Sequence, residues 1–107
     1  MESTIRALNE NVLAACRGQV IKFFASFPDA ALERRATKAM RLLATTERPL
    51  AGKPEGWAAG VIYAVANLDR QACGIPGLLN SEFTTFFSVS METVRRRAAF
   101  VAMQVFV

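Results

Sequence analysis

Three consecutive arginines at residues 95–97 are the side chains of this sequence best suited to binding an anionic partner. A guanidinium group can donate two parallel hydrogen bonds to a phosphate or to the edge of a guanine base. The arginines follow Ser90, a good helix N-cap, so they fall in the first two turns of a predicted helix. A helix-turn-helix places such turns in the major groove. The candidate nucleic-acid-binding residues of this helix are Met91, Glu92, Arg95, Arg96 and, at the boundary of the core, Arg97.

A second group of positive charges lies between residues 34 and 53, where six basic residues accompany a single acid, Glu47. Three of the basic residues recur on one helix face, opposite a predicted apolar stripe. Two interpretations are open: a solvated face that keeps the protein soluble, or a face that contacts phosphates. The candidate phosphate contacts are Arg34, Lys38, Arg41 and Lys53.

The residue types that most enzymes need are missing or badly spaced. The sequence has no histidine for general base catalysis, no glycine-rich phosphate loop with a lysine, and no pair of carboxylates placed to share one site. The two cysteines, Cys16 and Cys73, lack the spacing of zinc ligands, and nothing supports a disulfide between them. We therefore expect no catalysis, metal, cofactor or small-molecule substrate, and we expect Cys16 to be a core residue.

The composition predicts one globular domain, residues 1–107. Hydrophobic residues make up 52% of the chain and charged residues 21%, a balance unlike that of disordered proteins. The net charge of +4 is compatible with a nucleic-acid partner without requiring one. Residues 1–4 do not begin a signal peptide, and the uncharged run 57–66 is shorter than the roughly 20 residues that span a bilayer. We expect a cytoplasmic protein that does not cross a membrane.

The arginines need a scaffold, and residues 54–68 are its predicted centre. This stretch is apolar around nearly its whole helical circumference, so other helices must surround it. Pro54 suits the first helical position, and Glu55 complements the positive end of the helix dipole. Small residues such as Gly60 allow neighbouring backbones to approach closely, while Trp57 and other bulky residues fill the remaining space.

Two helices are predicted before this centre. The first runs from a cap at Ser3 or Thr4 to Phe27, and Gly18 leaves open whether it is one bent helix or two short ones. The second follows its N-cap, Asp29, and ends near residue 44. Helical periodicity predicts that the buried residues are Ile5, Leu8, Val12, Ala15, Cys16, Val20, Phe23 and Phe27 in the first helix and Ala31, Leu32, Ala36, Ala39, Met40 and Leu43 in the second.

Two more helices are predicted after the centre, and together they form a helix-turn-helix over about residues 80–107. A short helix over residues 82–87, capped by Asn80 or Ser81, leads through residues 88–90 into the arginine-bearing helix. The predicted inward residues are Phe83, Phe86 and Phe87 in the short helix and Val94, Ala98, Val101 and Val105 in the last.

Residues 52–66 (Gly-Lys-Pro-Glu-Gly-Trp-Ala-Ala-Gly-Val-Ile-Tyr-Ala-Val-Ala) and residues 88–97 (Ser-Val-Ser-Met-Glu-Thr-Val-Arg-Arg-Arg) resemble the cyclin-like repeat of transcription factor TFIIB and its archaeal counterpart. They are similar also to a bacterial domain family of unknown function. The resemblance implies an all-α, five-helix cyclin-like bundle, a transcription-related role, and base contacts from Glu92 and Arg95. The sequence departs from the pattern at Glu92, where an apolar residue is expected, and at Ser88, where glycine usually supplies a positive φ.

Two functions remain after these exclusions. The first is DNA binding by the last helix, with a homodimer or a protein partner expected because one recognition helix reads only a few base pairs. The second is a non-catalytic protein-protein interaction module, in which the arginines supply solubility or contact an acidic partner.

Overall fold

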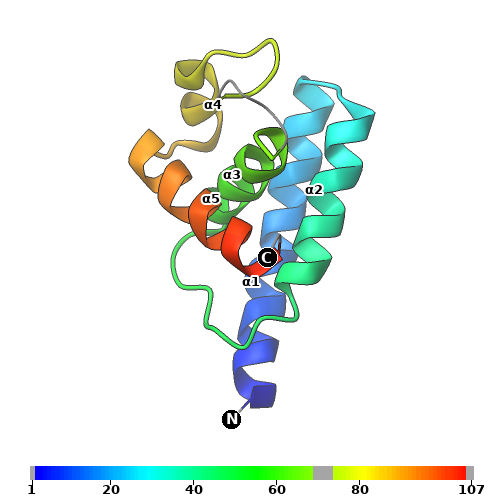
Figure 1. Ribbon diagram of the computed structural model, residues 1–107, viewed down its shortest axis with the longest axis vertical. Coiled ribbons are helices and arrows are strands. Elements are labelled where there is room, and N and C mark those ends of the chain that lie inside the picture. Colours follow the sequence, from blue (N-terminus) through cyan, green and yellow to red (C-terminus); the bar gives the residue numbers. More distant parts are fainter. Residues whose placement is uncertain (1, 69–73, 106–107) are drawn as a thin grey trace.

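The structure is a computed structural model that describes residues 2–68 and 74–105 (Figure 1). The described residues form five α-helices and no strand: α1 (Glu2–Ser26), α2 (Ala30–Leu43), α3 (Pro54–Ala66), α4 (Asn80–Phe87) and α5 (Met91–Val105). The all-α, five-helix prediction is therefore confirmed. A search of these residues for a helix long and apolar enough to span a bilayer finds none.

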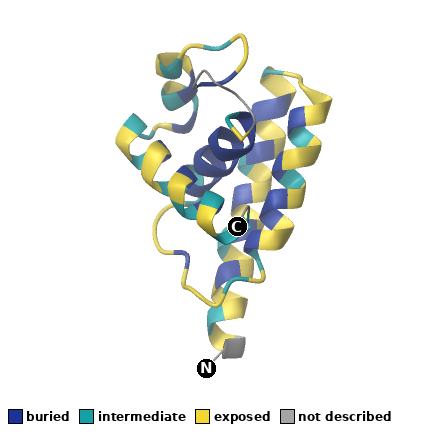
Figure 2. Cartoon of the chain, in the orientation of Figure 1, coloured by how far each residue is buried: buried dark blue, intermediate teal, exposed yellow. Residues whose placement is uncertain are grey.

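The central helix is α3, as predicted. Every residue from Gly56 to Ala66 is buried, and α3 packs against each of the other four helices. Figure 2 shows it as a continuous buried rod enclosed by partly exposed helices. The predicted end at Leu68 is wrong, because α3 stops at Ala66 and Leu68 is 45% exposed. Asn67 ends the helix, since both its backbone and its side-chain N–H donate to the Tyr63 carbonyl.

One continuous helix, α1, spans the region around Gly18, which decides between the two alternatives for this segment. Its N-terminal part extends beyond the other helices (Figure 1). Leu8 and Ala15 are exposed, so both were wrongly assigned to the core. Cys16, Val20 and Phe23 are buried as predicted, and the buried face also includes Asn9, Leu13 and Phe24.

Asn9 is turned inward by hydrogen bonds to the loop between α2 and α3. Its Oδ1 accepts from the Leu50 N–H at 2.9 Å, and its Nδ2 donates to the Arg48 carbonyl at 3.0 Å. The side chain is only 1% exposed. Since buried polar groups need partners, Asn9 fixes this loop against α1.

In α2, the predicted cap and almost all of the predicted buried stripe are confirmed. The Asp29 carboxylate accepts from the Leu32 N–H at 3.1 Å. The stripe is buried as predicted except for Ala31, which is exposed because it lies in the first turn, away from α3. The opposite face carries the basic residues and is exposed.

A cluster of phenylalanines joins α4 to α1. The rings of Phe83 and Phe87 lie 5.5 Å from the ring of Phe23, and both are buried. Phe86 is half-buried beside them. The predicted N-cap is wrong, because α4 begins at Asn80 with Leu79 in the cap position. Glu82 stabilises this start by accepting the Leu79 N–H at 2.9 Å.

Candidate nucleic-acid interface

The turn between α4 and α5 depends on a left-handed residue at Ser88. Ser88 has φ 55° and ψ 44°, which confirms the predicted need for positive φ at this position. Its N–H and that of Val89 donate to carbonyls of the last turn of α4. These bonds close α4 as a left-handed helix cap does, at a conformational cost of about 1 kcal/mol for a residue other than glycine. The turn is thus short and defined, so the start of α5 has a fixed position relative to α4.

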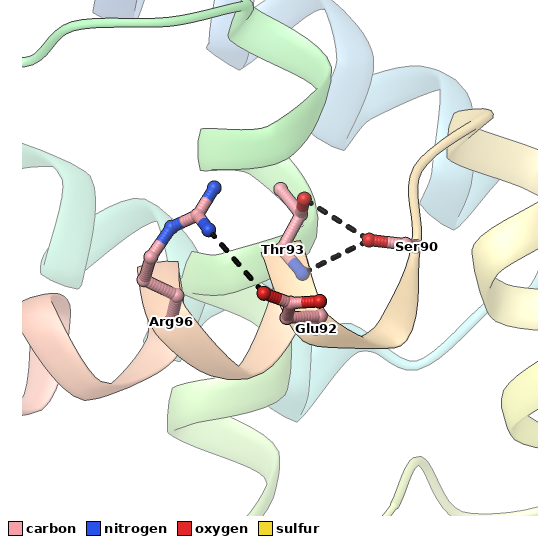
Figure 3. Close-up of polar contacts among 4 residues, drawn as sticks. All are labelled: Ser90, Glu92, Thr93 and Arg96. Atoms are coloured by element: carbon pink, nitrogen blue, oxygen red, sulfur yellow. Dashed lines mark hydrogen bonds and ion pairs between the residues drawn. The ribbon is translucent and has the colours of Figure 1, made fainter.

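Ser90 begins α5 as its N-cap, as predicted. The Thr93 N–H donates to Ser90 Oγ at 3.1 Å, and the two hydroxyl oxygens lie 3.1 Å apart (Figure 3). The cap satisfies a backbone donor that the helix itself leaves unpaired. The first turn of α5 is therefore ordered and presents the positive end of its dipole.

Arg95 and Arg96 are exposed on the next turn of α5. The Arg96 guanidinium lies 4.0 Å from the Glu92 carboxylate, in a pair whose side chains are 60% and 88% exposed (Figure 3). Exposed pairs at this spacing stabilise a helix by only about 0.3–0.5 kcal/mol. The Arg96 guanidinium can exchange such a weak partner for a phosphate. Met91, the remaining candidate in this turn, is half-buried and packs against the core.

Arg97 is placed differently from its two neighbours. Its guanidinium carbon lies 4.4 Å from the centre of the Trp57 ring, and its Nε is buried without a hydrogen-bond partner among the described residues. Burial lowers the pKa of Arg97, and the positive charge of Arg96 lowers it further. Arg97 therefore lies at the core boundary, as predicted. Its guanidinium packs against Trp57 and so links α5 to α3.

The loop over residues 45–53 runs beside α5 and approaches it at positions 97, 100 and 104. Thr46 Oγ1 donates to Gln104 Oε1 at 3.0 Å, and the Arg48 guanidinium carbon lies 5.2 Å from the centre of the Phe100 ring. At the other end of the loop, the Arg97 guanidinium fills the space that a side chain at Gly52 would need. Arg48 and Lys53 are both exposed, so the loop brings two further cations alongside α5.

Arg48 was not among the candidate contacts drawn from the sequence. The sequence does show an excess of basic residues between positions 34 and 53, and Arg48 is one of them. That excess does not predict which surface the Arg48 side chain occupies. Its position beside Phe100 depends on the loop path, which Asn9 holds.

The basic face of α2 lies elsewhere. Arg34, Lys38 and Arg41 are exposed and line a shallow depression on α2 itself. Lys38 also shares a groove with Val105, at the C-terminal end of α5. Arg95 is ten residues away from Val105 along α5, about 15 Å at 1.5 Å per residue. Lys53 is exposed and lies between Gly52 and Gly56, which both approach Arg97 of α5, whereas the α2 face is not joined to the exposed arginines.

Two further kinds of site were considered among the described residues, a metal site and a reactive thiol. Within residues 4–68 and 74–105, no three or more His, Cys, Asp or Glu side chains are grouped so that they could hold a metal ion. Cys16 is buried, as predicted, and its Sγ donates to the Pro54 carbonyl at 3.6 Å. Burial, with a smaller contribution from Glu55, raises the pKa of Cys16 to about 12, so the thiol stays protonated and unreactive. Cys73 lies outside the described residues.

No protein-family model, curated protein or solved structure matches this chain. The resemblance to the TFIIB repeat therefore remains a prediction from the two quoted segments. A function for the chain has to be argued from the surface of α5 and the loop beside it.

Proposed function

We propose that this chain is a non-catalytic DNA-binding protein that contacts duplex DNA through the N-terminal half of α5. The proposal includes the cyclin-like arrangement and the transcription-related role that the resemblance implies. The observation that carries it is the exposure of Arg95 and Arg96 in the first two turns of a capped helix that follows α4 by only residues 88–90.

The position of the two arginines suits groove contacts. In a helix-turn-helix the first turns of the second helix reach base edges, and arginine binds guanine or phosphate there. Arg97, held against Trp57, keeps α5 close to α3 beneath these two side chains. Glu92 can accept a hydrogen bond from the amino group of cytosine once Arg96 has moved to a phosphate.

The loop cations suit backbone contacts. Arg48 and Lys53 flank α5 and can reach phosphates on one side of a groove that α5 occupies. With Arg95 and Arg96 they would neutralise about four phosphates, for which log affinity falls with log salt with a slope of about −3.6. A single module of this size binds weakly, so the proposal includes a homodimer or a protein partner that adds further contacts.

The test is binding of a random-sequence duplex DNA across a series of salt concentrations, measured by fluorescence anisotropy on the full chain. The double variant Arg95→Ala/Arg96→Ala is compared with the wild type. We expect the affinity at low salt to fall at least about tenfold and the salt slope to flatten by about 1.8, since two phosphate or base contacts are lost.

A matched control removes the same charge elsewhere. Arg6→Ala/Arg17→Ala changes two exposed arginines on α1, a helix that packs mainly against α2 and α3. We expect the control to weaken binding less than about twofold, through net charge alone. Equal effects of the two double variants would show that α5 is not the interface. Absence of binding by the wild type at low salt would end the proposal.

A third double variant, Arg34→Ala/Arg41→Ala, decides the question left open for the α2 face. Because this face is separate from the α5 arginines, we expect it to behave like the control pair. A flattening of the salt slope as large as that of the α5 variant would instead add α2 to the DNA contacts.

A further inference from the structure

A groove runs between α2, the end of α3 and the C-terminal end of α5, well away from the exposed arginines of α5. It encloses about 270 Å³. Its lining is apolar apart from two cationic side chains. The apolar lining residues, here called the floor, are Ala39, Leu42, Val65, Leu68 and Val105, and the cationic ones, here called the rim, are Arg35 and Lys38.

The groove exposes apolar surface that the packing of residues 2–68 and 74–105 leaves accessible. Leu42 is 43% exposed and Leu68 is 45% exposed, and they are two of the few large hydrophobic residues that face solvent in the described chain. Both lie in the same hollow although Leu42 belongs to α2 and Leu68 follows the end of α3. Convergence of exposed aliphatic side chains in a concave site is typical of binding surfaces rather than of ordinary protein surface.

The positive charges around the groove favour a negatively charged occupant. Lys38 lies on the rim and also lines the neighbouring depression with Arg34 and Arg41, where Glu33 is the one acid among the described lining residues. An occupant that fills the apolar floor and carries carboxylates would meet these cations at the edge. Duplex DNA is negatively charged, but it has no aliphatic side chains that could pack against the floor. The volume is also below the roughly 300–1,000 Å³ of cofactor and drug pockets, so side chains of a peptide suit it better.

We propose that this groove docks an acidic segment of a partner protein, whose aliphatic side chains enter between Leu42 and Leu68 while its carboxylates pair with Lys38 and the adjacent basic face of α2. The segment binds as an amphipathic helix with anchors at i, i+3 and i+4, because two or three aliphatic side chains then face one hollow. This inference goes beyond DNA binding. The groove lies about 15 Å along α5 from Arg95 and shares no lining residue with the exposed arginines of α5.

The test uses a designed peptide of about two helical heptads in which Leu occupies one helical face and Asp and Glu fill the other positions. Its dissociation constant is measured by fluorescence anisotropy, and the site is mapped by NMR chemical shifts on the full chain. We expect shifts centred on Leu42, Leu68 and Val105. We also expect Leu42→Asp to weaken binding about tenfold and Lys38→Glu about threefold, since the first replaces an anchor contact with a carboxylate and the second reverses one charge.

Matched controls make the same changes on an unrelated surface. Ile21→Asp and Lys22→Glu alter an exposed aliphatic residue and an exposed lysine on α1, and we expect both to change the dissociation constant less than about twofold. A peptide of the same composition with the Leu residues dispersed around the helix should bind at least about tenfold more weakly than the designed one.

Several results would overturn the proposal. They are shifts centred outside the groove, equal effects of the groove and control variants, and no saturable binding by the wild type. Groove shifts that appear without peptide as protein concentration rises would assign the groove to a second copy of the chain. Groove shifts induced by duplex DNA would assign it to the DNA interface. None of these outcomes depends on whether the arginines of α5 bind DNA.

Discussion

The contact between α3 and α5 predicts opposite effects for one substitution made at two glycines. Gly60 lies on α3 directly beneath α5, and Gly18 lies on the exposed side of α1. Both are inside helices, so alanine removes the same backbone entropy penalty at each, worth about 1 kcal/mol. Any difference between the two variants therefore measures the space around the new methyl group.

The space is very different at the two positions. A Cβ added at Gly60 would lie 2.5 Å from the Cβ of Arg97, 3.1 Å from its carbonyl carbon and 3.2 Å from the Ala98 nitrogen. Carbon atoms in contact are normally about 3.5–4.0 Å apart, so α5 would have to move by about 1 Å. A Cβ added at Gly18 meets nothing within 4 Å.

The magnitudes follow from these contacts. Overpacking a core costs about 1–3 kcal/mol, and the upper half of that range applies because two of the three contacts at Gly60 are with backbone atoms. After subtraction of the helix-propensity gain, Gly60→Ala should lower the free energy of unfolding by about 1–2 kcal/mol. Gly18→Ala should raise it by about 0.5–1 kcal/mol.

The assay is urea and thermal unfolding followed by far-UV circular dichroism. At about 4 °C per kcal/mol, Tm should fall by about 4–8 °C for Gly60→Ala and rise by about 2–4 °C for Gly18→Ala. Unchanged m-values would show that the unfolded states are comparable. If Gly60→Ala were as stable as Gly18→Ala, the close approach of α5 to α3 would be refuted, and with it the account of how Arg97 is held.

Two further predictions concern buried polar groups. Asn9→Ala should lower the free energy of unfolding by about 1–3 kcal/mol in urea unfolding, because the Leu50 N–H loses its buried partner. A loss below about 1 kcal/mol would contradict the role of Asn9 in holding the loop. Burial raises the pKa of the Cys16 thiol from 9.0 to about 12 in the folded chain. Between these two values the unfolded chain releases a proton that the folded chain keeps. The free energy of unfolding should therefore fall with rising pH by up to about 1.4 kcal/mol per pH unit. Cys16→Ala, compared in a Cys73→Ser background, should remove that part of the pH dependence of the urea midpoint, and equal slopes with and without the thiol would contradict it.

The helices, and the starting points of α2, α3 and α5, could be predicted from the sequence because they depend on neighbouring residues. The other two predicted starts were wrong, since α1 already begins at Glu2, before Ser3 and Thr4, and α4 begins at Asn80. Pro54, Asp29 and Ser90 each begin a helix through a backbone or side-chain preference that acts within about one turn. The enclosure of residues 56–66 is also a local property, since a helix with no polar face must be surrounded.

The sequence was less informative about which face of a long helix is buried. Leu8 was assigned inward and Asn9 was not considered, yet the structure reverses them. The reversal depends on the loop over residues 45–53, whose backbone supplies hydrogen-bond partners to Asn9 from about forty positions away in the chain.

The sequence by itself determined that the protein is helical, that the segment beginning at Pro54 forms its centre, and that arginines follow a capped turn near residue 90, with Arg95 and Arg96 facing outward. Only the tertiary structure decided that the central helix stops at Ala66, that Arg97 is stacked on Trp57, and that the α2 face borders a groove at the other end of α5. The physical reason is the distance along the sequence over which each interaction acts. Caps and apolar periodicity act over a few residues, whereas the role of each charge is set by which helix packs beside it.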